Sequence, residues 1–180
     1  MNKILLLGDS IRLSYQQLVK EKLEGVAEVV GPEDNCRFAK YTLWNTGEWV
    51  TAFGKPDIIH WNNGIWDVFF LNKEMGIFTP IDEYKIYIGR VLKELRRTGA
   101  KIIWATTTPV REGAPCKNSD IDLYNAEANK IMRSENIDIN DLNKVIKEKD
   151  EYIAADNFHL SPEGIIVCAQ ACVDFLKKII

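Results

Sequence analysis

The amino-acid sequence predicts an α/β fold, in which a parallel sheet lies between two layers of helices. Short apolar runs, typical of strands buried on both faces, alternate about five times with segments whose apolar residues recur at helical spacing. Gly and Pro separate several of these segments. Strands and helices that alternate in this way form right-handed crossovers, which make the strands parallel.

Each element can be placed along the chain by its pattern. The strands are expected over residues 4–7, 26–30, 57–61, 101–106 and 137–140. The helices are expected from Ser10 to Leu23, over residues 38–53, 81–97, 121–135 and 142–147, and from Ser161 and Pro162 to Leu176. We therefore expect a three-layer, flavodoxin-like sandwich with strand order 2-1-3-4-5, built from one domain over residues 1–180.

Composition narrows the class of protein. The 180 residues suffice for one sizeable core, and the net charge of -3 demands no basic face, so a nucleic-acid partner is not expected. No apolar run has membrane-spanning length and residues 1–8 are too short for a secretion signal, so we expect no membrane partner and a cytoplasmic location. The four cysteines lack metal-ligand spacing, so no metal is expected there: Cys36, Cys116, Cys168 and Cys172.

The first strand ends abruptly at Gly8-Asp9-Ser10, and a helical pattern begins there. Ser10 therefore lies at the carboxyl end of a parallel strand, where α/β folds bind ligands. It also lies at a helix N-terminus, where free N–H groups favour a developing negative charge. Asp9 or Ser10 could simply cap the helix. The alternative is that Ser10 is a nucleophile.

A nucleophilic serine needs a base, and the chain has two histidines. His60 lies in the middle of a predicted strand and is expected to be a packed, structural imidazole. His159 lies in a loop, three residues after Asp156. A carboxylate at that spacing can hold one ring nitrogen and leave the other to accept the serine proton. Ser10, His159 and Asp156 thus supply the nucleophile, base and orienting group that acyl transfer requires.

The two motifs together resemble a known family. Gly8-Asp9-Ser10 near the N-terminus and residues 156–159 near the C-terminus look like the first and last blocks of the SGNH (GDSL-type) hydrolases, in the expected order and at the expected distance. The resemblance implies Ser10 as nucleophile, His159 as general base and then acid, and Asp156 as its partner. It also implies an esterase, lipase, thioesterase, deacetylase or acyltransferase that needs no metal or other cofactor.

The same resemblance implies an oxyanion hole, but its two middle blocks depart from the family pattern. The family usually has a Gly after the second strand, whose N–H binds the oxyanion. Gly47 is one candidate, although it falls within a helical pattern. The position expected from the spacing is Cys36, and a backbone donor there does not require Gly unless φ is positive. We therefore expect the N–H of Cys36 to serve as a donor.

The third block of the family is usually Gly-x-Asn-Asp. Here it aligns with residues 64–67, so Trp66 stands where the oxyanion Asn is expected. Asn62 and Asn63 lie just upstream and could supply an amide. Because successive strand residues point to opposite faces, only one is expected to enter the site, and we favour Asn62. Both could instead be turn-forming residues before Gly64.

Other residues near the expected crevice have more than one interpretation. Arg12 and Arg37 could bind an anionic or polyhydroxylated substrate, although such charges are more often solvated or structural. Residues 68–80 are aromatic and irregular, as in a loop that shapes a pocket. The five Trp and seven Phe could include a wall for a sugar or an acyl chain, although core packing is their usual role.

The sequence thus predicts a carboxylic ester hydrolase acting through an acyl-Ser10 intermediate. The expected partner is a small-molecule ester, and a small acyl group such as acetate on a carbohydrate is the leading substrate. A lysophospholipase, a thioesterase and an acyltransferase are alternatives with the same three residues. A ligand-binding module without turnover is the alternative outside the enzymes, and a phosphate-binding protein is disfavoured because no Gly-rich loop follows the first strand.

Overall fold

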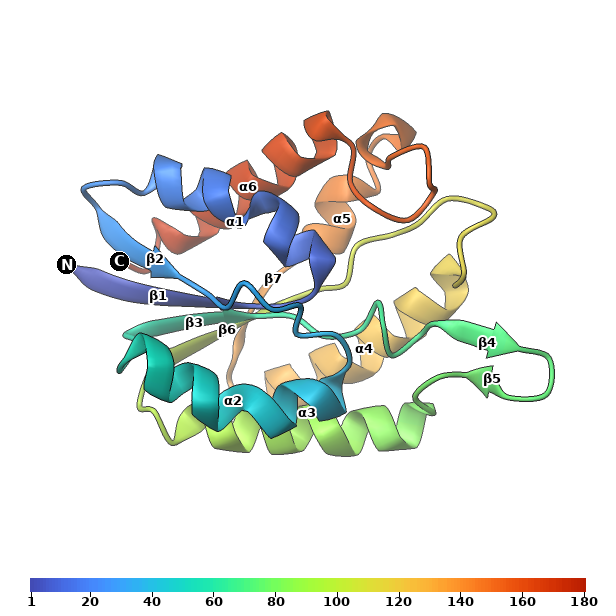
Figure 1. Cartoon of the computed structure of the whole chain (residues 1–180), viewed down its shortest axis with the longest axis horizontal. Coiled ribbons are helices and arrows are strands. Elements are labelled where there is room, and N and C mark those ends of the chain that lie inside the picture. Colours follow the sequence, from blue (N-terminus) through green and yellow to red (C-terminus); the bar gives the residue numbers. More distant parts are fainter.

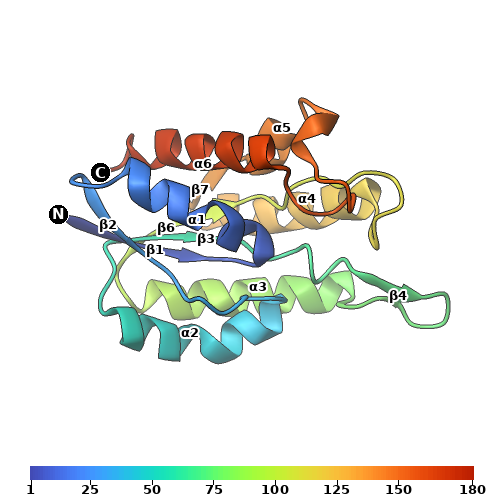
Figure 2. The ribbon, with the colours of Figure 1, turned by 45° about the horizontal axis from the view of Figure 1, so that its top comes forward.

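The computed structural model describes residues 1–180 and has a five-stranded parallel sheet between layers of helices (Figures 1 and 2). The strands of this sheet are β1 (Asn2–Leu7), β2 (Ala27–Val30), β3 (Ile58–Trp61), β6 (Lys101–Ala105) and β7 (Asp138–Asn140). Their spatial order is β2-β1-β3-β6-β7. Numbered within this sheet alone, that order is 2-1-3-4-5, so the predicted fold class and strand order are confirmed.

Six α-helices cover the two faces of the sheet. They are α1 (Ser10–Lys22), α2 (Ala39–Phe53), α3 (Ile81–Arg96), α4 (Asn118–Ser134), α5 (Leu142–Ile146) and α6 (Pro162–Leu176), with a short 3-10 helix, η1 (Asp150–Tyr152), before the last. Buried side chains of α2, α3 and α4 form one core with the sheet, and those of α1, α5 and α6 form a second core on its other face. None of the helices combines the length and the apolar character needed to cross a bilayer.

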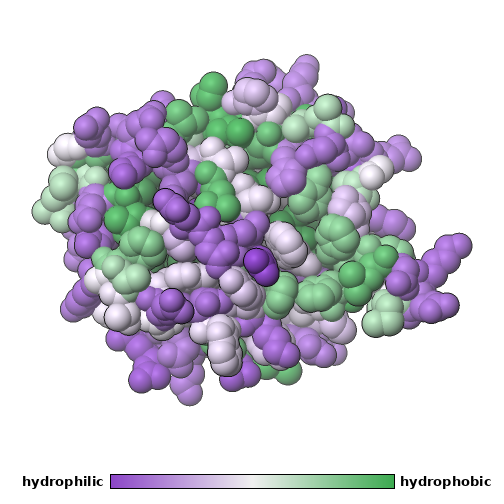
Figure 3. All heavy atoms as spheres, in the orientation of Figure 1, coloured by the Kyte–Doolittle hydropathy of each residue, from purple (hydrophilic) through white to green (hydrophobic).

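Residues 68–80, expected to form an irregular loop, contain a β-hairpin. Strands β4 (Phe70–Asn72) and β5 (Gly76–Ile77) pair antiparallel and form a separate two-stranded sheet. The hairpin projects from the body of the molecule at the end where the first strand ends and α1 begins (Figure 1). In the space-filling view, its tip is hydrophilic and hydrophobic side chains gather beside its base (Figure 3).

Alternation along β1 divides its side chains between the two cores. Leu5 and Leu7 belong to the core under α2, α3 and α4, whereas Ile4 and Leu6 belong to the core under α1, α5 and α6. All four are fully buried. Burying each such side chain stabilises the fold by about 1.5–3 kcal/mol, which explains why this strand reads as a continuous apolar run.

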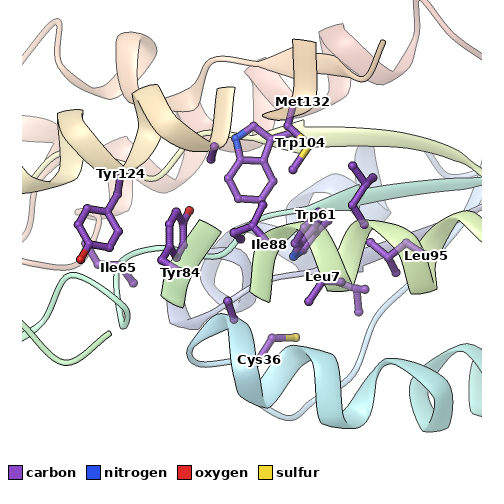
Figure 4. Close-up of a cluster of buried hydrophobic side chains, with 14 of the residues drawn as sticks. Leu7, Cys36, Trp61, Ile65, Tyr84, Ile88, Leu95, Trp104, Tyr124 and Met132 are labelled. Atoms are coloured by element: carbon purple, nitrogen blue, oxygen red, sulfur yellow. The ribbon is translucent and has the colours of Figure 1, made fainter. Parts of the chain in front are cut away.

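Aromatic side chains fill the middle of one core. Trp61 on β3 and Trp104 on β6 are fully buried, and their rings meet edge to face with centroids 4.8 Å apart. Tyr84 on α3 and Tyr124 on α4 pack nearby in the same core (Figure 4), with centroids 4.9 Å apart. These four residues thus have the core-packing role that is the default for Trp and Tyr.

His60 is also structural, as predicted. It lies within β3 and is fully buried, with Nε2 3.1 Å from Nδ2 of Asn140 and 3.7 Å from Sγ of Cys172. Burial lowers its pKa to about 4. The ring is therefore neutral at physiological pH and packs against α6, on one face of the sheet.

The register of the sheet brings several loops to one edge. Leu7 pairs with Trp61, and Trp61 pairs with Trp104, so β1, β3 and β6 end at nearly the same level. The segments that begin at residues 8, 62 and 106 therefore start side by side. This edge of the sheet carries the candidate site.

Candidate active site

Ser10 is the first residue of α1, and Asp9 caps the helix. The Asp9 carboxylate accepts the N–H of Ile11 at 2.9 Å, and the Asp9 carbonyl accepts the N–H of Leu13 at 3.0 Å. The N–H of Ser10 has no acceptor within the helix because no residue precedes it there by four positions. Asp9 is thus the cap, and Ser10 is left half-buried with its hydroxyl and N–H at the carboxyl end of β1.

His159 lies in the tight loop between η1 and α6. The N–H of Ala154 donates to the carbonyl of His159 at 2.7 Å, and the N–H of Asn157 donates to the carbonyl of Ala154 at 3.0 Å. Asn157 has φ of +65°, a left-handed conformation that Asn tolerates better than most residues. The loop therefore turns back on itself and presents the His159 ring on its outer side.

Asp156 shapes this loop and holds the ring at the same time. Its Oδ1 accepts the N–H groups of Phe158 at 3.0 Å and of His159 at 2.9 Å. Its Oδ2 lies 2.7 Å from Nδ1 of His159. The hydrogen bond with the His159 side chain, followed by the two N–H groups, lowers the pKa of Asp156 to about 2. The carboxylate is therefore ionised throughout the neutral range.

The other nitrogen of the ring meets Ser10. Nε2 of His159 lies 3.1 Å from Oγ of Ser10, although the two residues are 149 positions apart. The packing of α1 against α6 in one core brings them together. The three residues predicted as a nucleophile, a base and an orienting group thus form one continuous hydrogen-bonded chain.

Arg12 is buried beneath this site, so its guanidinium is neither solvated nor open to a substrate. It is 1% exposed. Its guanidinium donates to the carbonyl oxygens of Gly8 at 3.0 Å, Pro32 at 2.7 Å and Asp34 at 2.9 Å. Arg12 therefore has a structural role, which was one of its two predicted roles. It ties the turn after β1 to the loop after β2.

Cys36 lies in that loop, as the spacing predicted, but its N–H is not free. It donates to the carbonyl of Gly8 at 3.1 Å, and the side chain is fully buried. In this structure the N–H that was predicted to bind an oxyanion instead joins two loops. The alternative, Gly47, lies inside α2 and lines a groove with Trp44 and Tyr87, away from Ser10.

Asn62 and Asn63 also use their amides internally. Nδ2 of Asn62 donates to the carbonyl of Ala105 at 2.8 Å and to Oγ1 of Thr107 at 3.3 Å. Nδ2 of Asn63 donates to the carbonyl of Arg37 at 3.1 Å and to Oγ1 of Thr42 at 2.9 Å. Neither presents a free amide donor, so the predicted oxyanion hole is not assembled as expected. Both amides instead link neighbouring segments at the edge of the sheet.

Asn62 nevertheless lies close to the nucleophile turn. It lines a cavity of about 10 Å³ together with Asp9 and Thr108. Oδ2 of Asp9 and Oγ1 of Thr108 are buried and have no hydrogen-bond partner. Burial raises the pKa of Asp9 to about 6, partly opposed by the N–H of Ile11. A cavity of this size is about large enough for one water molecule.

The third block contributes a buried carboxyl rather than an oxyanion amide. Asp67 is fully buried and accepts the N–H of Ala39, the first residue of α2, at 3.1 Å. Burial raises its pKa to about 7, partly opposed by that N–H. Trp66, beside it, is 37% exposed and faces outward. Asp67 thus anchors the start of α2, and Trp66 contributes an aromatic surface.

Sequence reasoning missed Arg111, which positions the loop of His159. Its N–H donates to the carbonyl of Asn157 at 2.9 Å, and its guanidinium donates to the carbonyl of Ala154. Nothing in the sequence around Arg111 signals this role, because the contact depends on two loops meeting in space. Groups of three or more His, Cys, Asp or Glu side chains placed to hold a metal ion are absent from the structure.

Comparisons with known proteins agree on the fold. No protein-family profile and no curated protein sequence matches the chain. Among solved structures, the acetyl xylan esterase AlAXEase is 21% identical, with a TM-score of 0.80 over 99% of this chain and 100% of that chain. A lipase/acylhydrolase from Enterococcus faecalis is 22% identical, with a TM-score of 0.82 over 99% of this chain and 96% of that chain.

A third solved structure is described as GDSL-like, the same type that the two sequence motifs resemble. A GDSL-like lipase from Bacteroides thetaiotaomicron is 15% identical, with a TM-score of 0.78 over 99% of this chain and 89% of that chain. At these identities the likeness is one of fold. The resemblance drawn from the sequence is thereby confirmed at that level: the chain has the fold of the SGNH, or GDSL-type, hydrolases.

Proposed function

We propose that this protein is a serine esterase that hydrolyses carboxylic esters through an acyl-Ser10 intermediate. The observation that carries the proposal is the chain of contacts from Oγ of Ser10 through the two ring nitrogens of His159 to Oδ2 of Asp156, at 3.1 and 2.7 Å. Serine is a weak nucleophile until a base takes its proton, and this arrangement supplies the base and holds it in the required tautomer.

The reaction proceeds in two halves. Oγ of Ser10 attacks the ester carbonyl while Nε2 of His159 accepts the hydroxyl proton. The tetrahedral intermediate collapses, the bond to the alcohol breaks, and His159 returns the proton to the leaving oxygen. Water then attacks the acyl-Ser10 carbonyl, again losing a proton to His159, and the carboxylic acid leaves as Ser10 recovers its proton. Asp156 stays ionised and stabilises the imidazolium in both halves.

The oxyanion is held by the N–H of Ser10 and the positive end of the α1 dipole. The N–H of Ser10 has no acceptor within its own helix and is therefore available to the substrate. The predicted donors Cys36, Asn62 and Asn63 would each have to exchange an internal hydrogen bond for one to the substrate.

Exposure of the site supports hydrolysis over acyl transfer. The side chains of His159 and Asp156 are 47% and 52% exposed, so water reaches the acyl group. For the substrate we propose a small acyl ester, with an acetylated carbohydrate as the first candidate. The full-length similarity in fold to an acetyl xylan esterase supports it.

The test is hydrolysis of 4-nitrophenyl acetate and labelling by a fluorophosphonate. Wild-type protein should turn over the ester and take one label on Ser10. Ser10→Ala should lose the label and at least about 10³-fold in kcat. Ser14→Ala is the matched control, since its hydroxyl bonds the carbonyl of Ile11 on the same helix at 2.7 Å. If the wild type shows neither turnover nor label, the esterase proposal fails and a ligand-binding module without turnover is the better hypothesis.

A further inference from the structure

Five apolar side chains line an open pocket of about 350 Å³. We refer to it as the apolar pocket, and its walls are Phe38, Trp66, Phe69, Leu71 and Phe78. No polar side chain lines it. Ligand pockets in proteins usually begin at roughly 300 Å³, so this one has room for a short chain or a ring.

The walls come from three separate segments. Phe38 immediately precedes α2, Trp66 follows β3, and Phe69, Leu71 and Phe78 belong to the hairpin or flank it. The rings of Phe38 and Phe78 are in contact, with centroids 4.9 Å apart. The N–H of Phe78 donates to the carbonyl of Phe69 at 2.8 Å, which fixes the base of the hairpin. The shape of the pocket is therefore fixed by contacts between these segments.

Apolar side chains stay exposed around this pocket. Leu71 is 46% exposed and Phe78 is 41% exposed. Water contact with so much apolar surface is unfavourable, and contiguous exposed apolar patches commonly mark binding sites. An apolar group that entered the pocket would remove this surface from water.

Two chains of contacts join the pocket to the catalytic edge. On one side, Phe38 lies two positions after Cys36, whose N–H is bonded to the carbonyl of Gly8 near Ser10. On the other side, the N–H of Phe70 donates at 2.8 Å to the carbonyl of Pro115. That carbonyl belongs to the loop whose Arg111 is bonded to the loop of His159. The segments that line the pocket are thus tied by hydrogen bonds to the loops that carry Ser10 and His159.

We propose that the apolar pocket binds an apolar chain or ring of the ester substrate, and that Trp66 and Leu71 determine specificity there. This inference rests on the proposed function. The apolar group belongs either to the acyl part of the ester or to its alcohol. An acetyl ester would therefore carry it on the alcohol, and a longer acyl ester would carry it on the acyl chain.

The experiment measures kcat/KM in two series of esters. The acyl series is 4-nitrophenyl acetate, butyrate and octanoate, and the alcohol series is ethyl, hexyl and 2-phenylethyl acetate. In one series, kcat/KM of the wild type should rise by about fourfold for each methylene until the pocket is full. The series that responds identifies the part of the ester that enters.

Leu71→Gln and Trp66→Ala test the walls. Each should lower the ratio of kcat/KM for the longest over the shortest ester of that series by at least tenfold. Met75→Gln and Trp44→Ala are the matched controls, because Met75 is 67% exposed, Trp44 is 86% exposed, and neither lines the pocket. The controls should keep the wild-type ratio.

The outcomes separate the two proposals. Ester hydrolysis that depends on Ser10, with ratios unchanged by Leu71→Gln and Trp66→Ala in both series, overturns the pocket and leaves the esterase. Absence of any Ser10-dependent hydrolysis overturns the esterase. The pocket is then tested by titrating octanoate and 2-phenylethanol into Ser10→Ala protein in a calorimeter. Binding of either that Leu71→Gln weakens at least fivefold supports the pocket, and no such binding contradicts it.

Discussion

The carboxylate of Asp156 makes two kinds of contact with His159, one with its ring and one with its backbone. Oδ2 lies 2.7 Å from Nδ1, and Oδ1 accepts the N–H at 2.9 Å. The carboxylate that we propose orients the base therefore also fixes the loop that carries His159. The two roles can be separated because they use different oxygens.

Asp156→Asn separates them. An amide oxygen in place of Oδ1 can still accept the N–H groups of Phe158 and His159, whereas its NH₂ group now faces Nδ1. The ring must then carry its proton on Nε2 and cannot take one from Ser10. We expect kcat for 4-nitrophenyl acetate to fall by about 10³–10⁴-fold with little change in the thermal unfolding midpoint.

Asp174→Asn on the exposed side of α6 is the matched control and should keep full activity, since its carboxylate contacts only Gln170. A loss of less than tenfold in Asp156→Asn would contradict the orienting role assigned to this carboxylate.

Asp67 should make stability depend on pH. Its pKa is raised from 3.8 to about 7, so the native protein holds a proton that the unfolded chain releases between those values. Between about pH 4 and about pH 7 the native protein binds more protons than the unfolded chain. The free energy of unfolding therefore decreases as pH rises through this range. The loss of unfolding free energy over this range is on the order of 4 kcal/mol. Asp67→Asn should remove most of it while still accepting the N–H of Ala39.

Urea unfolding of both proteins at several pH values checks this. The difference in unfolding free energy between Asp67→Asn and the wild type should grow in favour of the variant as pH rises. A difference that stays constant from pH 4 to pH 8 would show that Asp67 does not hold its proton in the native state.

Arg12→Lys should weaken both the fold and the activity. A single ammonium cannot reproduce the hydrogen bonds of a buried guanidinium to three carbonyls on two loops. We expect a loss of about 2–4 kcal/mol in unfolding free energy, together with a lower kcat, because the turn before Ser10 loses its brace. Arg97→Lys, at a side chain that is 75% exposed, should change stability by less than about 0.5 kcal/mol.

The four thiols should be inert in the native protein. Cys36, Cys116, Cys168 and Cys172 are free and buried, and burial raises the pKa of each. Since the thiolate is the reactive form, a chromogenic disulfide reagent should titrate none of them before unfolding and four in urea. Rapid reaction of even one thiol in the native protein would place it outside the core.

Local pattern was sufficient to predict the sheet and the meeting of Ser10, His159 and Asp156. The alternation that places Leu5 and Leu7 on one face is a property of the strand itself, and the turn at Ser10 follows from the change of period after Leu7. Ser10 and His159 could be paired because the carboxyl ends of parallel strands share one edge. These inferences need only the topology and the spacing of residues.

The hydrogen-bond partners of individual donors around the site could not be predicted from the sequence. The N–H of Cys36 is taken by Gly8 because two loops touch, and the buried state of Arg12 depends on carbonyls from those loops. The hairpin at β4 and β5 has only two or three residues in each strand, too few to show a period. Its stability comes from long-range contacts such as that of Phe70 with Pro115.

The 149 positions between Ser10 and His159 have a consequence for how activity arises during synthesis. The proposed nucleophile, Ser10, is made among the first residues, but it meets His159 only when the loop before α6 has been made and α6 has docked against α1. A chain interrupted just before residue 159 contains the residues of all five strands of the main sheet but lacks His159. Ester cleavage would therefore report that the final segment has docked, and nascent chains would stay inactive until then.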